Sequence, residues 1–402
     1  MRESKAPVVI TQVWYRVGAA DEVDGKTGLA HMLEHMMFQG TKKLAPSQFS
    51  KIVARNGGDD NASTAHDYTN YWIKLSSDRL ELALELEADR MQNLRLQEVE
   101  FRSENLVVQE ERRSRIENKP EAKFFEKFRK TAYGDHPYGR PVIGLMDDVK
   151  NHSLEGLQDW YKSHYAPDKA VLVVVGDIDF DHAQKLVEKH FSYLKHSQSL
   201  PRKPLPKIPP RKEAVRLDVQ DDRATLPQYY AGFWVPTFMM ADADEAFALE
   251  LLSAILGGDA SSRIYRKLVV EDKLAISAGS GYSGLSRGGE LFTLSAVPGS
   301  GVKLDQVEKA LFEQVEKLIT QPISERELQR AKNGLITGHL FAQDSVDRIA
   351  WLIGRMSSNN SDWKLLVEEY PARVQKVTSQ EIKKVAKRYL QVKSAVIGTF
   401  HP

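Results

Sequence analysis

Apolar and polar residues form short, regular groups along the first half of the chain. Residues 7–17 alternate loosely and are rich in Val, Ile, Trp and Tyr, which predicts a strand. Residues 29–38 carry apolar side chains at helical spacing and stop before Gly40, so we expect a helix there. Residues 61–75 are typical of an extended segment. The other elements expected before residue 195 are helices over 47–56 (with Ser47 as N-cap), 79–94, 98–117, 154–164 and 181–194, and a buried strand that begins at Ala170.

A proline-rich stretch separates the two halves of the chain. Residues 196–215 carry five prolines and five Lys or Arg residues, which predicts an extended linker whose basic side chains are solvated. After it the pattern starts again, with a strand over 229–234 and a helix over 243–256. The sequence HYAPDKAVLVVVGDID resembles RYLQVKSAVIGTF near the C-terminus, and Tyr165 matches Tyr389. We therefore predict an α+β protein built by duplication.

The duplication defines the expected domains. Each is an α/β domain with an antiparallel or mixed sheet and flanking helices. The first covers residues 1–195, the linker covers 196–215, and the second covers 216–402.

The composition excludes several classes of protein. The chain has 402 residues, of which 42% are hydrophobic and 28% charged, enough for two or three domain cores. Its 56 basic and 55 acidic residues leave a formal charge of +1, which argues against nucleic-acid binding driven by bulk charge and against disorder. No apolar run approaches the ~20 residues of a membrane-spanning helix. Cys is absent, so disulfides and thiolate chemistry are excluded.

The strongest local signal is HMLEH at residues 31–35. On a helix, positions i and i+4 share one face about 5–6 Å apart at Cβ, so His31 and His35 can hold one metal ion. Glu34 is offset on the same side, where it can reach a water on the ion. The order H-x-x-E-H is the inverzincin motif, and two imidazoles with one carboxylate suit a single Zn²⁺ with an open fourth position. The alternative is that these residues and their Met, Leu and Phe neighbours form an ordinary core.

A third ligand is expected from ENLVVQEE at residues 104–111. Glu104 and Glu111 are seven residues apart, almost two helical turns, so they share a face that includes Val107 and Val108. Two carboxylates on an apolar face are costly unless a cation pairs with them. We therefore assign Glu111 as the ligand, Glu104 as a nearby assisting carboxylate, and Glu110, turned about 100° away, as a surface residue. The alternative is a solvated, charged helix.

Several sequence motifs carry a family resemblance. They are GLAHMLEHMMFQGT, ENLVVQEERRSRIEN, NASTAHDYTNY, HPYGRPVIG, YAPDKAVLVVVGD and GGDASSRIYRKL. Together they cover nearly the whole chain and resemble the pitrilysin/insulinase family of zinc peptidases, in particular the short-chain branch that includes bacterial peptidases and mitochondrial processing peptidase. The resemblance places the zinc ligands on His31, His35 and Glu111, the general base on Glu34 and the supporting carboxylate on Glu104. It also implies a half-clamshell fold.

The resemblance further implies a peptidase reaction. Zn²⁺ would activate water and polarise the scissile carbonyl, while Glu34 takes the water proton and passes it to the leaving amine. The segment Asn61, Ala62 and Ser63 falls on the family's edge strand, to which substrate adds as a further strand through main-chain hydrogen bonds.

One segment departs from the family pattern. Family members carry an Arg and a Tyr, seven residues apart, in S-R-L-x-x-x-L-R-E-x-x-G-L-A-Y-S. This chain reads SRIYRKLVVEDKLAIS at residues 262–277, with Val269 at the Arg position and Ile276 at the Tyr position. We interpret the segment as ordinary core. A homodimer would then lack the Arg/Tyr pair, which predicts a heterodimer with a different homologous subunit that supplies it.

Two other functions compete with a catalytic subunit: a non-catalytic assembly subunit and a peptide-binding module of the same fold. The N-terminus has no apolar signal region, and the strand that family members carry before Ala6 is missing, so we expect a trimmed or processed start. Signal peptides in bacterial relatives favour the periplasm, and the cytoplasm is the alternative.

Overall fold

The chain folds into two compact units, each built around one sheet. The computed structural model describes residues 1–196, 202–208, 211–240 and 243–402. The first unit comprises Met1–Arg115, Arg140–Pro204 and Ala342–Val367, and the second comprises Ile116–Gly139, Leu205–Phe341 and Glu368–Pro402. Neither unit is therefore one continuous stretch of chain.

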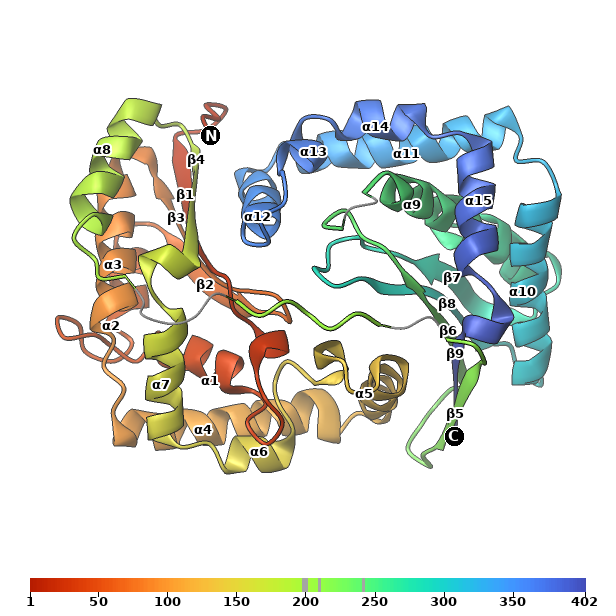
Figure 1. Ribbon diagram of the computed structural model, residues 1–402, viewed down its shortest axis with the longest axis horizontal. Coiled ribbons are helices and arrows are strands. Elements are labelled where there is room, and N and C mark those ends of the chain that lie inside the picture. The colour runs from red at the N-terminus through yellow and green to blue at the C-terminus, as the bar shows by residue number, and fades with distance from the viewer. Residues whose placement is uncertain (197–201, 209–210, 241–242) are drawn as a thin grey trace. The chain divides into compact units, whose positions relative to one another are not determined.

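The sheet of the first unit is antiparallel, with the order β2-β3-β1-β4 (Figure 1). Its strands are β1 (Val8–Tyr15), β2 (Asp59–Thr64), β3 (Thr69–Ser76) and β4 (Ala170–Gly176). The segment 61–75, expected to be extended, is the hairpin of β2 and β3, in which Ala62 pairs with Tyr71 and Thr64 with Thr69. The strand β2 stands at the end of this order, with β3 on one side, so it forms an edge of the sheet.

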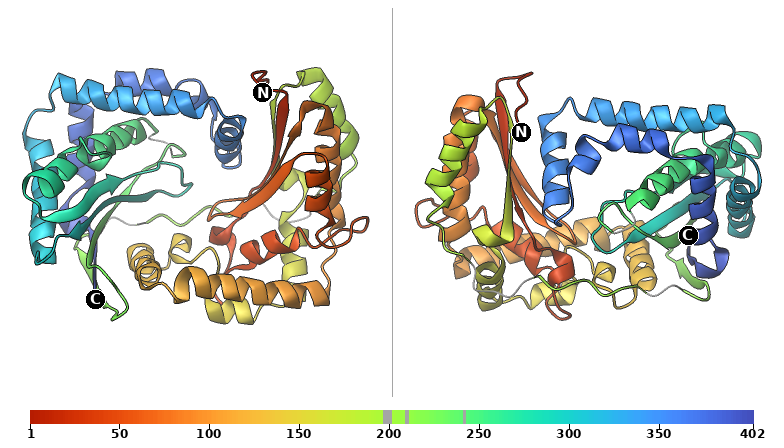
Figure 2. Two further views of the ribbon diagram at one scale, coloured as in Figure 1. Left: turned by 180° about the vertical axis from the view of Figure 1, so that it is seen from behind. Right: turned by 45° about the horizontal axis from the view of Figure 1, so that its top comes forward.

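Helices cover both faces of this sheet (Figures 1 and 2). Val9 packs on one face with Leu80 and Leu84 of α3 and Ala183 of α8, and the opposite face packs on α12. The α-helices of the unit are α1 (Leu29–Met36), α2 (Gln48–Arg55), α3 (Leu80–Asn93), α4 (Glu98–Arg112), α6 (Met146–Lys150), α7 (Leu154–His164), α8 (Phe180–Phe191), α12 (Val346–Ser357) and α13 (Lys364–Val367). Its short 3₁₀ turns are Ala19–Asp21, Ser77–Arg79 and Pro167–Lys169, and a π-helical turn, Arg113–Glu117, follows α4.

A fully buried ion pair on α3 lies against aromatic residues of α2 and β3. The side chains of Glu87 and Arg90 are 0% exposed, and they form two hydrogen bonds of 2.8 and 2.5 Å. The Arg90 guanidinium carbon also lies 4.2 Å from the centre of the Phe49 ring and 4.5 Å from that of Tyr71. Aromatic faces thus cover the cation that Glu87 neutralises.

The second unit repeats the sheet of the first. Its strands are β5 (Val215–Gln220), β6 (Gln228–Val235), β7 (Ala275–Gly281), β8 (Glu290–Pro298) and β9 (Val396–His401), in the order β5-β9-β6-β8-β7. Only β5 and β9 are parallel among these pairs in the described residues. If β5 is set aside, β6, β7, β8 and β9 occupy the positions of β1, β2, β3 and β4.

The helices of the second unit are α5 (Pro120–Tyr133), α9 (Ala243–Gly257), α10 (Leu304–Thr320), α11 (Glu325–Ala342), α14 (Tyr370–Lys376) and α15 (Ser379–Tyr389), with 3₁₀ turns at Pro137–Gly139 and Val392–Ser394 and a π-helical turn, η6, at Tyr265–Glu271. The predicted repeat also appears here. A helix, then Tyr165 or Tyr389, then a 3₁₀ turn leads into β4 or β9. The prediction of two duplicated α/β domains with antiparallel and mixed sheets is thus confirmed.

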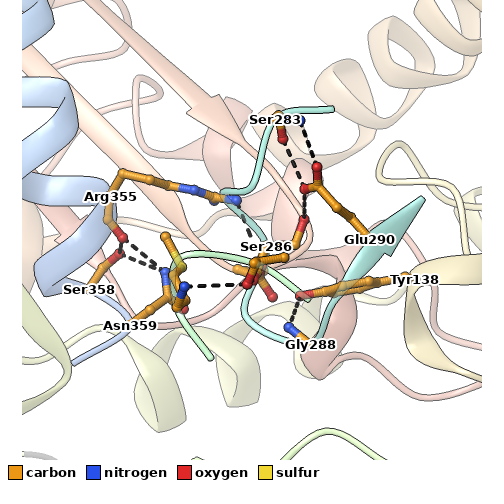
Figure 3. A network of polar contacts seen from close by, with 12 residues as sticks. Tyr138, Ser283, Ser286, Gly288, Glu290, Arg355, Ser358 and Asn359 are labelled. Carbon is orange, nitrogen blue, oxygen red and sulfur yellow. Dashed lines mark hydrogen bonds and ion pairs between the residues drawn. The ribbon is translucent and has the colours of Figure 1, made fainter. Parts of the chain in front are cut away.

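The connection between β7 and β8 is fixed by Glu290 (Figure 3). Its Oε1 accepts from the Ser283 amide at 2.7 Å, and its Oε2 accepts from the Ser283 and Ser286 hydroxyls at 2.9 and 3.1 Å. The amide of Gly288 donates to the hydroxyl of Tyr138 at 3.0 Å. These bonds satisfy polar groups of a loop that carries no regular structure.

Several expectations need revision. The predicted domains, residues 1–195 and 216–402, differ from the two units in the placement of two helices. The helix α5 lies within residues 1–195 but belongs to the second unit, and α12 lies within residues 216–402 but belongs to the first. Ser47 does not cap α2 with its side chain, because its backbone is left-handed at φ 59°. Residues 197–201 and 209–210 of the predicted linker lie outside the described residues. In its described part, Arg202 is not solvated: it pairs with Asp21 at 2.6 Å, and both side chains are less than 20% exposed.

Candidate metal centre

The helix α1, which carries the HMLEH sequence, is anchored at its N-terminus. Gly28 precedes it with φ 89°, and a Cβ there would lie 2.7 Å from the carbonyl oxygen of Ile143, so only glycine fits. The buried carboxylate of Glu22 accepts from the amides of Gly28 and Ala30, both at 2.8 Å. A carboxylate at this end stabilises a helix because it satisfies amides that have no partner within the helix.

The structure brings His31, His35 and Glu111 together. One donor atom from each residue lies within 4.8 Å of the other two. Glu111 Oε2 is 3.6 Å from His31 Nε2 and 3.2 Å from His35 Nε2. The histidines come from α1 and Glu111 from α4, two helices of the first unit, and all three side chains are at most 21% exposed.

The chemistry of this donor set fits a zinc ion. Tetrahedral ligands about 2.0–2.1 Å from Zn²⁺ lie about 3.4 Å from one another, close to the distances that separate Glu111 from the two imidazole nitrogens. Two nitrogens and one oxygen are also the donors that catalytic zinc takes, with one position left open. Both Nε2 atoms lie within 3.6 Å of the same carboxylate oxygen, a convergence of donors that ordinary core packing does not require.

Without a cation, the pKa values of the three groups depend on one another. Burial opposes a charge on His35, but its hydrogen bonds to Glu104 and Glu111 raise its pKa to about 9. Burial and then the charge on His35 lower the pKa of His31, and the hydrogen bond from His35 is the main cause that lowers the pKa of Glu111. A metal ion would replace the proton on His35, so metal affinity should fall as the pH is lowered.

Glu104 lies behind His35 and is itself fixed. Its Oε2 is 3.2 Å from His35 Nδ1, and its Oε1 accepts from Gln39 Nε2 at 2.8 Å. Both carboxylate oxygens are therefore used. An Nδ1–H bond to a carboxylate holds the imidazole in the tautomer that leaves Nε2 free for a ligand role.

Glu34 has a different neighbour. Its Oε2 accepts a short hydrogen bond from the hydroxyl of Thr64, the last residue of β2. Burial raises the pKa of Glu34, and the bond from Thr64 opposes that rise. The carboxylate is thus held beside the histidines, but it does not belong to the group of three donors.

The predicted substrate-binding residues lie on β2, the edge strand next to this centre. Asn61 and Ser63 are exposed and Ala62 is half-buried. Asn61 Oδ1 accepts from the amide of Ala62 at 2.8 Å, and the Ser63 hydroxyl donates to Asn70 at 2.5 Å. On this edge strand, the backbone amide of Ala62 is thus bonded to the Asn61 side chain.

The sequence interpretation missed several contacts of the site. Thr64 and Gln39 hold Glu34 and Glu104, and Arg115 pairs with Glu111 Oε1 at 2.7 Å. A basic residue four positions after Glu111 is an ordinary helical pair and could have been read from the spacing. The contacts of Thr64 and Gln39 depend on how β2 and α4 pack on α1.

For other residues near the motifs, the observed exposure of the side chain agrees with the prediction at some positions and differs at others. Glu110 is exposed and pairs with Arg113 at 3.0 Å, as expected for a surface residue. Val108 is buried, whereas Val107 is 47% exposed, so the apolar face between the two glutamates is narrower than expected. The interpretation of residues 262–277 as core is wrong for Ile276, which is 57% exposed at the start of β7.

Comparison with known proteins identifies the family. Residues 1–145 match the family model "Insulinase (Peptidase family M16)", and residues 151–335 match "Peptidase M16 inactive domain". The chain is 38% identical over 332 residues to the zinc protease PqqE of Helicobacter pylori, across 82% of this chain and 74% of that protein. The chain belongs to peptidase family M16.

One solved structure and one further relative extend the comparison. The crystal structure of a protease from Helicobacter pylori matches with a TM-score of 0.91 and 34% identity, covering 99% of this chain and 95% of that one. A probable mitochondrial-processing peptidase subunit beta of Arabidopsis thaliana is 25% identical and covers 97% of this chain and 73% of its own length. The resemblance predicted from the motifs is therefore confirmed. Among the described residues, none of the helices is long and apolar enough to cross a membrane.

Proposed function

We propose that this M16 chain is the catalytic subunit of a zinc-dependent peptidase that cleaves extended peptides, and that it works in a heterodimer. One observation carries the proposal: His31, His35 and Glu111 bring three donor atoms within 4.8 Å of one another, next to the carboxylate of Glu34. The names of the relatives support a zinc protease in general. One ion per chain, the cleavage within peptides and the partner are our inference.

The proposed chemistry divides the work among the residues of the site. His31, His35 and Glu111 would hold the ion, which as a Lewis acid polarises the scissile carbonyl and lowers the pKa of water. Glu34 accepts a proton from the attacking water while the water oxygen forms a bond to the carbonyl carbon. When the C–N bond breaks, Glu34 returns this proton to the leaving amine.

Glu104 and β2 complete the proposed site. Glu104 acts as a positioning residue through His35 Nδ1, because it lies behind the imidazole and both its oxygens are already bonded. The main chain at Asn61, Ala62 and Ser63 would pair with an extended peptide, which gives affinity with little dependence on side chains. Asn61 would release the Ala62 amide as the peptide binds.

The decisive experiment compares Glu34→Gln with the unchanged chain. We expect one zinc per chain in both proteins by elemental analysis. With the partner present, the unchanged chain should hydrolyse a quenched-fluorescence peptide and Glu34→Gln should not. Glu110→Gln on the exposed side of α4 is the matched control and should keep full activity. If Glu34→Gln keeps the activity, or if the unchanged chain binds no zinc, the chain is instead an assembly or peptide-binding subunit.

The heterodimer rests on Val269 and Ile276, which stand where the family pattern has Arg and Tyr. It is also supported by the subunit named in the Arabidopsis relative. We expect the purified single chain to be weakly active and to gain activity when mixed with a homologous chain that carries the pair. Full activity of the single chain would contradict the heterodimer while leaving the zinc peptidase intact. A periplasmic location is part of the same proposal, and cell fractionation tests it.

A further inference from the structure

A polar pocket lies within the second unit, on elements that contribute nothing to the metal centre. It has a volume of about 570 Å³, and its lining residues come from the π-helical turn η6 and the residues just before it, from α10 and from the start of α11. Of its ten lining residues, five are Lys or Arg and two are Glu. The cationic residues come from two separate elements, which a simple run of basic sequence would not produce.

Not all of these charges are neutralised. Arg263 is fully paired with Glu327 by hydrogen bonds of 2.8 and 2.7 Å, and Lys267 lies 2.9 Å from Asp272. Arg266 reaches Glu271 only at 3.8 Å, and its side chain is 61% exposed.

The two arginines of α11 add further positive charge. Arg330 donates to the Ser261 carbonyl oxygen at 3.3 Å and acts on the carboxyl of Asp259 from a distance. Within the described residues, Arg326 has no salt bridge. Arg326 and Arg330 also share one face of α11 four residues apart, an arrangement of like charges that destabilises a helix. An anion between them would remove this repulsion.

A buried donor belongs to one of the residues that line the same pocket. Gln314 of α10 lines it and is 5% exposed, and its amide nitrogen Nε2 is shielded from solvent without a hydrogen-bond partner in the described structure. A buried donor left unpaired is costly, so an acceptor that reached this nitrogen would be stabilised. The pocket also contains Ser324, whose hydroxyl accepts from the Glu327 amide at 3.2 Å at the start of the 18-residue helix α11. The positive end of that helix therefore points toward the pocket region.

We propose that this pocket binds a phosphate-bearing small molecule. Several guanidinium groups, an amide donor and a helix N-terminus together match the oxygens of phosphate groups, because arginine presents paired N–H donors to tetrahedral oxyanions. The volume is in the range that holds small ligands. This site is independent of the metal centre and of the proposed function, since it uses other residues and a different chemistry.

The test uses the full chain and sodium tripolyphosphate as the probe. Isothermal titration at constant ionic strength should show saturable binding, and Arg326→Ala should weaken it about tenfold, the loss of one charge-assisted contact. Gln314→Met, which keeps the volume of the side chain, should also weaken binding several-fold. Lys384→Ala on the exposed face of α15 removes a charge away from the pocket and should change nothing.

Three results would overturn the proposal. They are the absence of saturable binding, an equal loss with Lys384→Ala, and stronger binding of citrate, a tricarboxylate, than of tripolyphosphate. Circular dichroism of each variant confirms that it is folded before titration. Because the readout is binding and not peptide hydrolysis, repeating the titration with Glu34→Gln should give the same affinity. A failure here thus stays separate from a failure of the peptidase assignment.

Discussion

Thr64 connects the edge strand β2 to the carboxylate of Glu34, and Thr64→Val removes its hydroxyl while keeping its shape. The hydroxyl donates to Glu34 Oε2, and this bond is the main interaction that opposes the rise of the Glu34 pKa caused by burial. If Glu34 is the general base, the variant should keep its zinc and its fold but place the base less accurately.

The size of the effect follows from this contact. A hydrogen bond to a charged group contributes about 1.5–3 kcal/mol, and the half-buried position of both residues argues for the lower part of that range. A loss of about 1.5–2 kcal/mol corresponds to a roughly 10- to 30-fold decrease in kcat. Burial raises the pKa of Glu34 and Thr64 opposes the rise, so the variant should raise that pKa further. Since the base must be ionised, the acid limb of the rate profile should move to higher pH.

Steady-state peptide hydrolysis from pH 5 to 9 measures both effects. Thr64→Ser, which restores the hydroxyl, should recover most of the rate. Thr320→Val removes an exposed hydroxyl that donates to a carbonyl of its own helix at 2.8 Å and serves as the control. An unchanged kcat and an unmoved acid limb in Thr64→Val, with zinc still bound, would refute the reasoning.

Three further predictions test the supports of the site and the fold. Gln39→Leu frees one oxygen of Glu104 and should weaken zinc binding roughly tenfold in a chelator competition assay; unchanged affinity would show that Glu104 needs no anchor. Glu87→Gln leaves the buried cation of Arg90 without its counter-charge and should lower the free energy of unfolding by about 3–5 kcal/mol in urea, whereas a loss below 1 kcal/mol would contradict the buried pair. Burial raises the pKa of Glu250 to about 7, above its unfolded value, so its contribution to stability is present below about pH 4.5 and is lost as the pH rises through 7, a change of roughly 3 kcal/mol. Glu250→Gln should flatten that pH dependence in urea titrations at pH 5 and 8.

The metal motif could be predicted from sequence because its geometry is local. His31 and His35 lie on one helix at a spacing that fixes their separation, and the same is true of Glu104 and Glu111. The contact between α1 and α4 is not local, and its prediction relied on the family motifs. The repeat of helix, Tyr and strand around Tyr165 was also a local signal.

The missed features depend on contacts between distant parts of the chain. Thr64 meets Glu34 because β2 ends beside α1, and Gln39 meets Glu104 because α4 packs on the end of α1. The helix α5 was not predicted, and its Phe124 stacks on Phe400 with ring centres 5.2 Å apart, a pairing that no local pattern announces. Ile276 is apolar but exposed, so its residue type alone misled the burial assignment.

The return of α12 to the first sheet affects how the protein is made. Ile349 and Ala350 cover the face formed by Ile10, Trp14 and Val175, yet they are synthesised more than a hundred residues after β4. At a translation rate of about 5–20 residues per second, that face stays open on the ribosome for roughly 10–30 s. An exposed apolar sheet face of this kind is a target for chaperones and a route to aggregation. A fragment that stops at Pro204 should therefore be insoluble, and adding residues 342–367 as a separate peptide should rescue it.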